Sequence, residues 1–162
     1  MDIYVQEITQ SIFVELPDAQ TFWRVSARMV AATVLGGIVG WQRESEGKAA
    51  GLRTHMIVSL AASTVVIVCM ESAMAIDHLA RVIEGILTGV GFIGAGAILK
   101  NEAKERIKGL TTAATILLTT VVGITTGLGW LWVSCLIICL ALLILMAMAR
   151  FEPPANKEGQ VR

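Results

Sequence analysis

The chain has 162 residues, a formal net charge of zero and a mean hydropathy of +0.70, and 55% of its residues are hydrophobic. This composition is too apolar for an ordinary soluble domain, and the balanced charge gives no basic excess for nucleic acid, so no nucleic-acid partner is expected. No Asp, Glu, Lys or Arg occurs between Gly109 and Ala149. At 1.5 Å per helical residue, this stretch is about twice the ~30 Å of a bilayer core. We therefore predict an integral membrane protein.

The first 22 residues combine acidic with apolar side chains and contain no Lys or Arg. A cleavable signal peptide has a basic start, so this segment is not expected to be one. Its apolar residues recur at helical spacing until Pro17. We predict an amphipathic segment over residues 1–22 that lies on the outer surface of the membrane.

Clusters of charge divide the rest of the chain into apolar stretches of membrane-spanning length. We predict a transmembrane domain over residues 23–150, with spans at about 23–42, 54–70, 82–99, 110–128 and 130–149, followed by a short cytoplasmic tail at 151–162. The Gly-Leu-Gly-Trp sequence at 127–130 marks the turn between the last two spans. The predicted fold class is all-α, a bundle of about five transmembrane helices.

The loops also predict an orientation. Most of the 13 Lys and Arg residues lie in the loops at 43–53 and 100–109 and in the C-terminal tail, which all fall on one side of the membrane. By the positive-inside rule that side is cytoplasmic, so the N-terminus is outside and the C-terminus is inside.

The stretch GVGFIGAG at 89–96 contains the G-x-G-x-x-G spacing of dinucleotide-binding loops. That motif requires a buried strand before the glycines and a soluble βαβ unit around them, whereas these glycines lie inside an apolar span. We interpret them as a packing surface, because a residue without a side chain lets two helix backbones approach closely. The first and third spans are therefore expected to pack on each other or on a partner subunit, through Gly36, Gly40, Gly85, Gly89, Gly91, Gly94 and Gly96.

Two charged residues lie within apolar spans, Arg28 in the first and Glu84 in the third. Both spans are predicted to run from outside to inside, and each charge lies one turn beyond another arginine, so their depths should match. One interpretation is an intramembrane Arg28–Glu84 ion pair, since ionisable groups at such positions are usually paired. The alternative is that both side chains extend separately to the outer interface.

Two polar loops, at 41–55 and 100–115, are predicted at the cytoplasmic surface. Each leads through a Gly-Leu sequence into a span that runs from inside to outside, so these residues share a membrane depth. The residues of these loops act either as solvated anchors or as a cluster in which Arg53 binds an anionic headgroup, a carboxylate of a partner, or Glu44 of the same chain. The candidate polar cluster consists of Arg43, Glu44, Lys48, Arg53, Thr54, Thr111 and Thr112.

The sequence suggests no catalytic, metal or cofactor site. His55 and His78 fall on opposite sides of the membrane in this topology, so they cannot share a metal ion. Cys69, Cys135 and Cys139 lie in apolar runs without metal-ligand spacing, and the loop glutamates that Mg²⁺ would need alternate with Lys and Arg. We therefore expect the protein to be neither an enzyme nor a cofactor carrier.

Three motifs follow one another in the chain: Arg43-Glu44-x-x-x-Lys48-x-Ala-Gly-Leu-Arg53-Thr54, then Gly-Val-Gly-Phe-Ile-Gly-Ala-Gly at 89–96, then Gly-Leu-Thr-Thr-Ala-Ala at 109–114. Over residues 30–130 the chain resembles the MgtC/SapB family of bacterial inner-membrane proteins. The resemblance implies about five membrane helices and adaptation to low magnesium, with survival inside host cells in pathogens. It also implies binding to a membrane complex, because one branch is thought to restrain the F-type ATP synthase, and no enzymatic activity.

The chain departs from the family pattern at Gln42, where many members have an acidic residue, and at Leu117, where a tryptophan is common. It resembles a short form without the soluble C-terminal domain of longer members. We predict a regulatory or accessory membrane protein, surrounded by lipid, that forms homo-oligomers and contacts another inner-membrane complex. The alternative is a small oligomeric ion transporter or channel, with Glu84 and Arg28 near an outer vestibule and the Arg53 cluster at the inner mouth. A second interpretation of the glycines is that they break the third span and free backbone groups to line an ion or ligand site.

The predicted orientation can be tested with a reporter that is active only in the cytoplasm. A fusion after Arg162 should give a signal and a fusion after Leu128 should give none, because these positions lie on opposite sides of the membrane. The reverse pattern of signals would refute the orientation.

Overall fold

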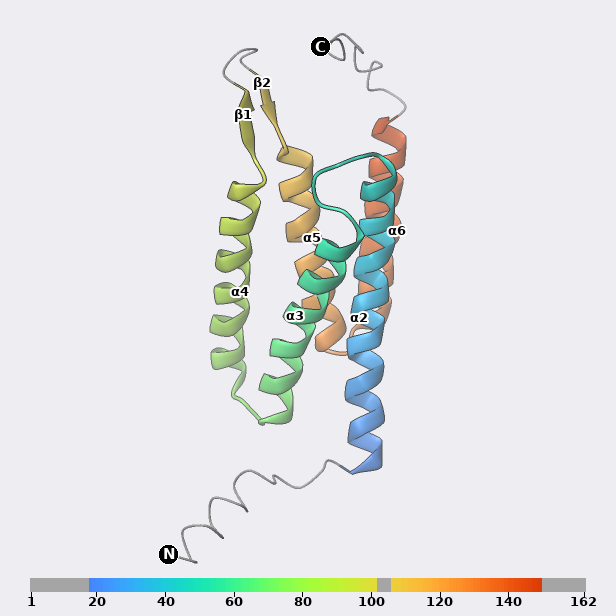
Figure 1. Ribbon diagram of the computed structural model, residues 1–162. Coiled ribbons are helices and arrows are strands. Elements are labelled where there is room, and N and C mark those ends of the chain that lie inside the picture. The colour runs from blue at the N-terminus through green and yellow to red at the C-terminus, as the bar shows by residue number, and fades with distance from the viewer. Residues whose placement is uncertain (1–17, 102–105, 150–162) are drawn as a thin grey trace, which may run out of the picture.

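The computed structural model describes residues 18–101 and 106–149, and these form five helices and one short β-hairpin. The helices are α2 (Ala19–Ser45), α3 (Leu52–Glu71), α4 (Ile76–Gly96), α5 (Leu110–Gly127) and α6 (Leu131–Ala149). Strands β1 (Leu99–Asn101) and β2 (Arg106–Lys108) pair antiparallel, with Leu99 opposite Lys108. The hairpin and the loop at 46–51 lie at the same end of the bundle (Figure 1), which we call the hairpin end.

The all-α membrane fold class is confirmed. Helices α2, α3, α4 and α5 are each long and apolar enough to cross a membrane, and α6 adds an apolar helix over Leu131–Ala147. The hairpin between α4 and α5 was not predicted. The sequence also predicts an outer-surface segment at 1–22 and a cytoplasmic tail at 151–162. Residues 1–17 of the first segment and the whole of the second lie outside the described residues.

Two helices begin well before their predicted apolar spans. Helix α2 starts at Ala19, where the side chain of Asp18 accepts a hydrogen bond from the Thr21 backbone N–H and caps the first turn. Hydrogen bonding from Thr21 also lowers the pKa of the Asp18 carboxyl below its usual value. Helix α4 starts at Ile76 rather than near residue 82, because charged residues continue a helix beyond its apolar middle.

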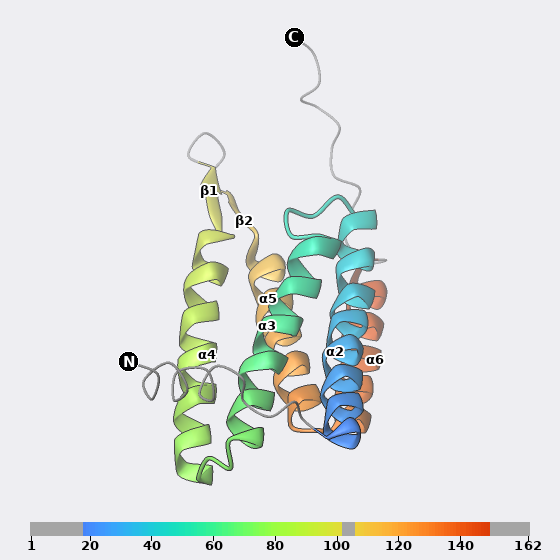
Figure 2. The same ribbon diagram turned by 60° about the horizontal axis from the view of Figure 1, so that its bottom comes forward.

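Helix α3 is the central element of the bundle. It packs most extensively on α2 and α5, whereas α4 contacts mainly α5. In both ribbon views α3 and α5 lie between α4 on one side and the α2–α6 pair on the other (Figures 1 and 2). Helix α4 therefore forms one edge of the bundle.

Glycines of α2 let it approach α3 at backbone distance. A Cβ atom placed on Gly36 would lie 2.6 Å from the carbonyl oxygen of His55, and one placed on Gly40 would lie 2.7 Å from the Cα atom of Leu52. These two glycines were expected to pack against the third span or a partner, but the structure places them against the second. Helices joined by a short loop pack as antiparallel neighbours, which explains this arrangement.

A second glycine pair, Gly123 and Gly127 of α5, has the same spacing and also packs against α3. A Cβ atom on Gly127 would lie 2.8 Å from the carbonyl oxygen of Ser63, and one on Gly123 would collide with the carbonyl oxygen of Ser59. The close packing of this pair was not predicted from the sequence. Helix α3 is thus held between two glycine surfaces.

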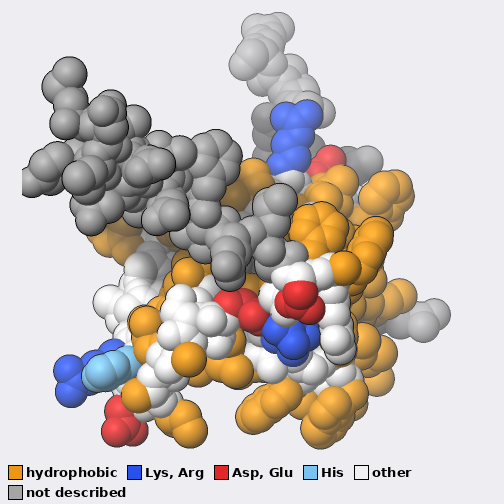
Figure 3. All heavy atoms as spheres, turned by 90° about the horizontal axis from the view of Figure 1, so that it is seen from below, with side chains coloured by type: hydrophobic (Ala, Val, Ile, Leu, Met, Phe, Trp, Pro, Cys, Tyr) orange, Lys and Arg blue, Asp and Glu red, His pale blue; other side chains and the backbone are white. Residues whose placement is uncertain are grey.

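Apolar side chains complete the core and cover the outside. One buried cluster joins Val39 of α2, Val122 of α5 and Ile138 of α6. Many large apolar side chains are exposed, including Trp23 and Ile57, as expected where lipid replaces water. Seen from the end opposite the hairpin, hydrophobic side chains form much of the rim, while charged ones gather near the middle and at one edge (Figure 3).

We predict that Gly123→Ala destabilises the protein by about 1–3 kcal/mol, because the new methyl group meets the α3 backbone, which cannot move aside easily. This loss should exceed the gain of about 1 kcal/mol that alanine brings to a helix. The matched control is Gly85→Ala on α4, where nothing lies within 4 Å of the added atom. Thermal unfolding in detergent measures both; equal stability of the two variants would contradict the close approach of α3 and α5.

Candidate functional site

The first sequence motif folds into the connection between α2 and α3 at the hairpin end. Glu44, in the last turn of α2, accepts a hydrogen bond from the backbone N–H of Leu52, with 2.7 Å between Oε2 and N. Leu52 is the first residue of α3, where backbone N–H groups have no partner within the helix. The carboxylate thus caps α3 and also complements the positive end of its dipole.

The glycine of this motif has a steric explanation. A Cβ atom on Gly51 would lie 2.6 Å from Oε2 of Glu44, so a side chain there would displace the carboxylate from its capping position. The carbonyl oxygen of Gly51 is 2.9 Å from Nδ1 of His55. Because a carbonyl can only accept, Nδ1 carries the hydrogen in this contact. Glu44, Gly51 and His55 therefore fix the start of α3 together.

Arg43 lies beside this cap and is almost completely buried, with 2% of its surface exposed. Its Nη1 atom is 3.2 Å from Oε2 of Glu46, which forms an ion pair across the last turn of α2. A cation at this position also complements the negative end of the α2 dipole. The guanidinium is therefore part of the folded connection rather than of an open binding surface.

The other residues of the predicted polar cluster are not drawn into this network. Arg53 is exposed and makes no hydrogen bond or ion pair with the residues that the structure describes. Thr111 is exposed at the start of α5, while Thr112 is buried and its carbonyl accepts a hydrogen bond from Thr115. Lys48 and Thr54 are half-buried. The structure thus joins Arg43 and Glu44 to the fold and leaves Arg53 available at the surface.

A line of buried polar side chains runs through the bundle, and we call it the polar seam. On α3 it contains His55, Ser59 and Ser63, which are spaced by four residues and have 0% exposure. Its remaining members are Thr115, Thr119, Thr120, Thr126 and Ser134 on α5 and α6. The seam passes from the hairpin end toward the opposite end of α5.

Most hydroxyl groups of the polar seam have a hydrogen-bond partner within the protein. The hydroxyl of Thr119 donates to the Thr115 carbonyl at 2.8 Å, and that of Thr126 donates to Ser134 at 2.9 Å. By contrast, Nε2 of His55 and the hydroxyls of Ser59 and Ser63 have no hydrogen-bond partner among the described residues. Each such group costs roughly 1–3 kcal/mol when it is left without a partner. These three groups on α3 are the candidates for contact with water or another polar molecule.

Arg28 closes the opposite end of the seam. Its Nη1 atom donates to the carbonyl oxygen of Gly127, at 3.1 Å, where the last turn of α5 has carbonyls without helical partners. Gly129 adopts φ +88°, and a Cβ atom there would lie 2.6 Å from Nη2 of Arg28. The structure therefore does not bring Arg28 and Glu84 together. The end of α5, which lies beside α2, supplies the negative partner instead.

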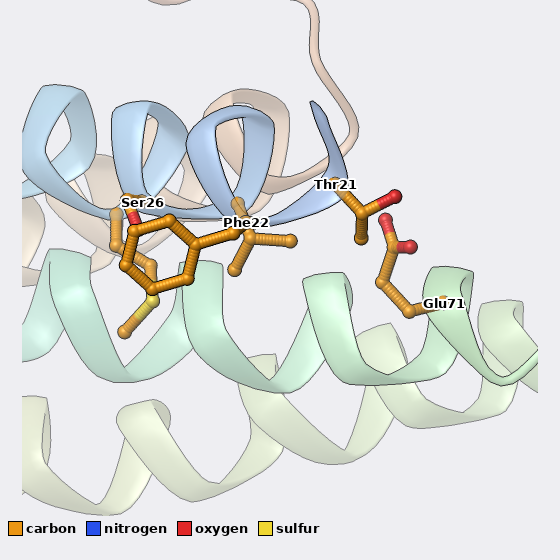
Figure 4. Close-up of a pocket in the computed structure, with 6 residues that line it drawn as sticks. Thr21, Phe22, Ser26 and Glu71 are labelled. Carbon is orange, nitrogen blue, oxygen red and sulfur yellow. The ribbon is translucent and has the colours of Figure 1, made fainter. Parts of the chain in front are cut away.

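An ion pair that was not predicted from the sequence joins α2 and α3 at this end. Nη2 of Arg24 is 3.0 Å from Oε2 of Glu71. Beside it a cavity of about 520 Å³ opens between the two helices, with Phe22 and Ser26 along α2 and Thr21 facing Glu71 (Figure 4). The pair is largely exposed, so it contributes at most about 1 kcal/mol. Sequence spacing alone could not indicate it, because Glu71 belongs to a different span.

The glycines of α4 lie mostly on its free side. Nothing is within 4 Å of a Cβ atom placed on Gly85, Gly89, Gly91 or Gly96, whereas Gly94 faces Ala113 of α5. Ile83, Ile86 and Leu87 attach the other side of α4 to a buried cluster of α3 and α5. Between α3 and α4 lies a cavity of about 260 Å³ with an almost entirely apolar lining.

Glu84 also lies on the free side of α4. It is exposed, and its carboxylate makes no hydrogen bond or ion pair within residues 18–101 and 106–149. Arg81, one turn earlier on the same helix, is exposed and is likewise without a partner there. An exposed acid and an exposed base therefore occupy one side of a membrane-spanning helix.

The described ranges contain no group of three His, Cys, Asp or Glu side chains that could hold a metal ion. Glu102 and Glu105, two of the loop glutamates whose carboxylates could contact Mg²⁺, lie outside these ranges. The expectation that the protein has no metal site therefore stays a prediction.

Comparison with known proteins gives consistent matches. The sequence model of the MgtC family matches residues 29–153. Protein SrpB of Synechococcus elongatus is 38% identical over 119 residues, covering 67% of this chain and 65% of that protein. The "Putative magnesium transporter YhiD" of Escherichia coli K12 is 38% identical over 109 residues, covering 63% of this chain and 50% of the relative. Protein MgtC of Salmonella typhimurium LT2 is 32% identical over 139 residues, covering 83% and 58%.

The chain thus spans between half and two thirds of the length of these relatives. No solved structure matches it. The matched region includes all three sequence motifs and every helix from α3 to α6.

We predict that Glu44→Ala lowers the stability of the protein by about 0.5–2 kcal/mol, because the first N–H of α3 loses its cap. Arg53→Ala, nine residues further along the chain, is the matched control and should leave stability unchanged, since its side chain contacts no partner in the described structure. Thermal unfolding and hydrogen exchange of the Leu52 amide measure the effect. An unprotected Leu52 amide in the unmodified protein would contradict the cap.

Proposed function

The chain belongs to the MgtC family, and from this we propose that it is a regulatory or accessory protein of the bacterial inner membrane that acts through contacts between membrane helices. The name of the relative YhiD supports a connection with magnesium, so we place the role in adaptation to low magnesium. In this proposal the hairpin end faces the cytoplasm, as the distribution of Lys and Arg indicates. The protein carries out no chemical reaction.

The observation that carries the proposal is the free side of α4, which we call the outer face. Its members are Arg81, Glu84, Gly85, Thr88, Gly89, Phe92 and Gly96, all exposed. Surfaces that face lipid are normally covered by large apolar side chains, whereas small residues mark the places where two helices meet in a membrane. Charges in a membrane span also require a partner. The outer face therefore has the composition of a helix-docking surface.

The rest of the bundle supports α4 as a rigid scaffold. Gly36 and Gly123 bring α2 and α5 against α3, Glu44 caps α3, and Arg28 bonds the end of α5. Because these contacts are internal, substitutions on the outer face should alter docking without unfolding the protein.

One observation favours the alternative, an oligomeric ion transporter or channel. The unpartnered groups of His55, Ser59 and Ser63 follow one another along the interior and could contact water or an ion. Against it, Gly36 and Gly123 pack their helices on the same stretch of α3 at backbone distance, which leaves little room for a passage. We therefore prefer the regulatory function.

We predict that Gly89→Leu abolishes function without lowering the unfolding temperature, because its side chain projects into the space that the partner helix should occupy. Growth in low-magnesium medium of a strain that lacks the gene and carries the variant measures function. Val30→Leu, at a lipid-facing position of α2, is the control and should support normal growth. Normal growth with Gly89→Leu would contradict a docking role for the outer face.

Flux measurements separate the two functions. Purified protein in liposomes should pass no Mg²⁺, K⁺ or protons beyond the background of empty liposomes. The regulatory function would be wrong, and the transporter function right, if the unmodified protein passed ions and Ser59→Ala abolished this flux without lowering the unfolding temperature.

A further inference from the structure

We propose that the outer face of α4 binds the same face of a second copy of the chain, in a parallel pair in which Arg81 of each copy forms an ion pair with Glu84 of the other. This inference rests on the proposed function in one respect, because it takes the outer face to be a helix-docking surface. The inference goes beyond the proposed function because it names a second copy of the chain as the partner and assigns the charged residues that select this partner.

The shape of the outer face suits a helix of the same kind. Gly85, Gly89, Phe92 and Gly96 are separated by four, three and four residues, so they form one line along α4. Phe92 has 84% of its surface exposed, while a Cβ atom on any of the three glycines would meet nothing within 4 Å. Each copy therefore offers one large ring and the hollows beside it, and two copies fill each other's hollows.

The charges of the outer face are complementary to themselves. Arg81 and Glu84 lie about one helical turn apart on the same side of α4. All copies of a membrane protein have the same orientation, so a two-fold axis runs along the membrane normal and places equal residues at equal depth. The long arginine side chain then bridges the turn to the partner's Glu84, and the second ion pair follows by symmetry.

A second copy also removes the energetic cost of an unpaired charge in the membrane-spanning part of α4. Glu84 lies about 12 Å along α4 from Ile76, within a helix that is apolar enough to span the membrane. An unpaired carboxylate within a membrane span is costly, and Arg81, just before the apolar stretch, also has no counter-charge among the described residues. A hydrocarbon chain of a lipid would supply neither counter-charge, whereas the same face of another copy supplies both.

The test uses two charge-reversal variants of the full-length protein in liposomes. Copies carrying Arg81→Glu present two acids, and copies carrying Glu84→Arg present two bases, so each variant alone should lose dimer affinity by about tenfold or more. A mixture of the two variants should regain it, because both ion pairs re-form between unlike copies. Förster transfer between donor- and acceptor-labelled chains measures association, and the unfolding temperature of each variant checks that it is folded.

The mixture distinguishes pairing between copies from pairing within one helix. An Arg81–Glu84 contact inside a single chain would be restored by exchanging both residues in that chain, but not by mixing two single variants. Single variants that associate as strongly as the unmodified protein, or a mixture that fails to recover association, would overturn the proposed pair.

Cross-linking separates failure of this inference from failure of the proposed function. In a background with Cys69→Ala, Cys135→Ser and Cys139→Ser, Phe92→Cys should form a disulfide between two copies, whereas Val90→Cys, on the attached side of α4, should not. If residue 92 cross-links in native membranes only to a different protein, the inference is wrong and the docking function stands. If lipid-soluble thiol reagents modify the cysteine at position 92 as rapidly as the one in Val30→Cys, position 92 faces lipid, and both the self-association and the docking function are wrong.

Discussion

The close approach of α3 to its two neighbours is the constraint on which the rest of the structure depends. Gly36 and Gly123 bring backbone against backbone, and this contact places His55, Ser59 and Ser63 of α3 in the interior. Threonines of α5 can line the same interior because they bond to their own helix. Because α2, α3 and α5 are held together in this way, the cap at Glu44 and the hydrogen bond from Arg28 have fixed positions, and α4 packs at one edge of the bundle.

The membrane fold could be predicted because apolar stretches of the necessary length are a local property of the sequence. The ends of the helices could not, since the charged residues of α4 before residue 82 continue the helix without adding apolar character. The hydrogen-bond partner of Arg28 could not be predicted either. Depth along a helix suggested Glu84 as its partner, but the nearer negative group is the carbonyl of Gly127, which no side-chain pattern reveals.

For the candidate site, too, the residues could be predicted from the sequence but their geometry could not. The motif around Glu44 and Gly51 could be recognised from the sequence, but its capping geometry depends on how the chain turns between α2 and α3. Among the glycines, the pairs at 36/40 and 85/89 were recognised as packing candidates, whereas the pair at 123 and 127, which has the same four-residue spacing, was not. Spacing also could not tell which glycines face a neighbour within the chain and which face outward, since that depends on the order in which the helices pack.

The short connections at the two ends of α4 have a consequence for how a partner is recognised. The β1–β2 hairpin joins α4 to α5 at one end, and the turn after Glu71, where Ala73 adopts φ +50°, joins it to α3 at the other. Because both ends of α4 are joined to neighbouring helices, its position along the membrane normal is tied to theirs. The height of Arg81 and Glu84 in the bilayer is then set by the rest of the bundle, so a partner is selected by the depth at which it presents its own charges, as well as by its shape.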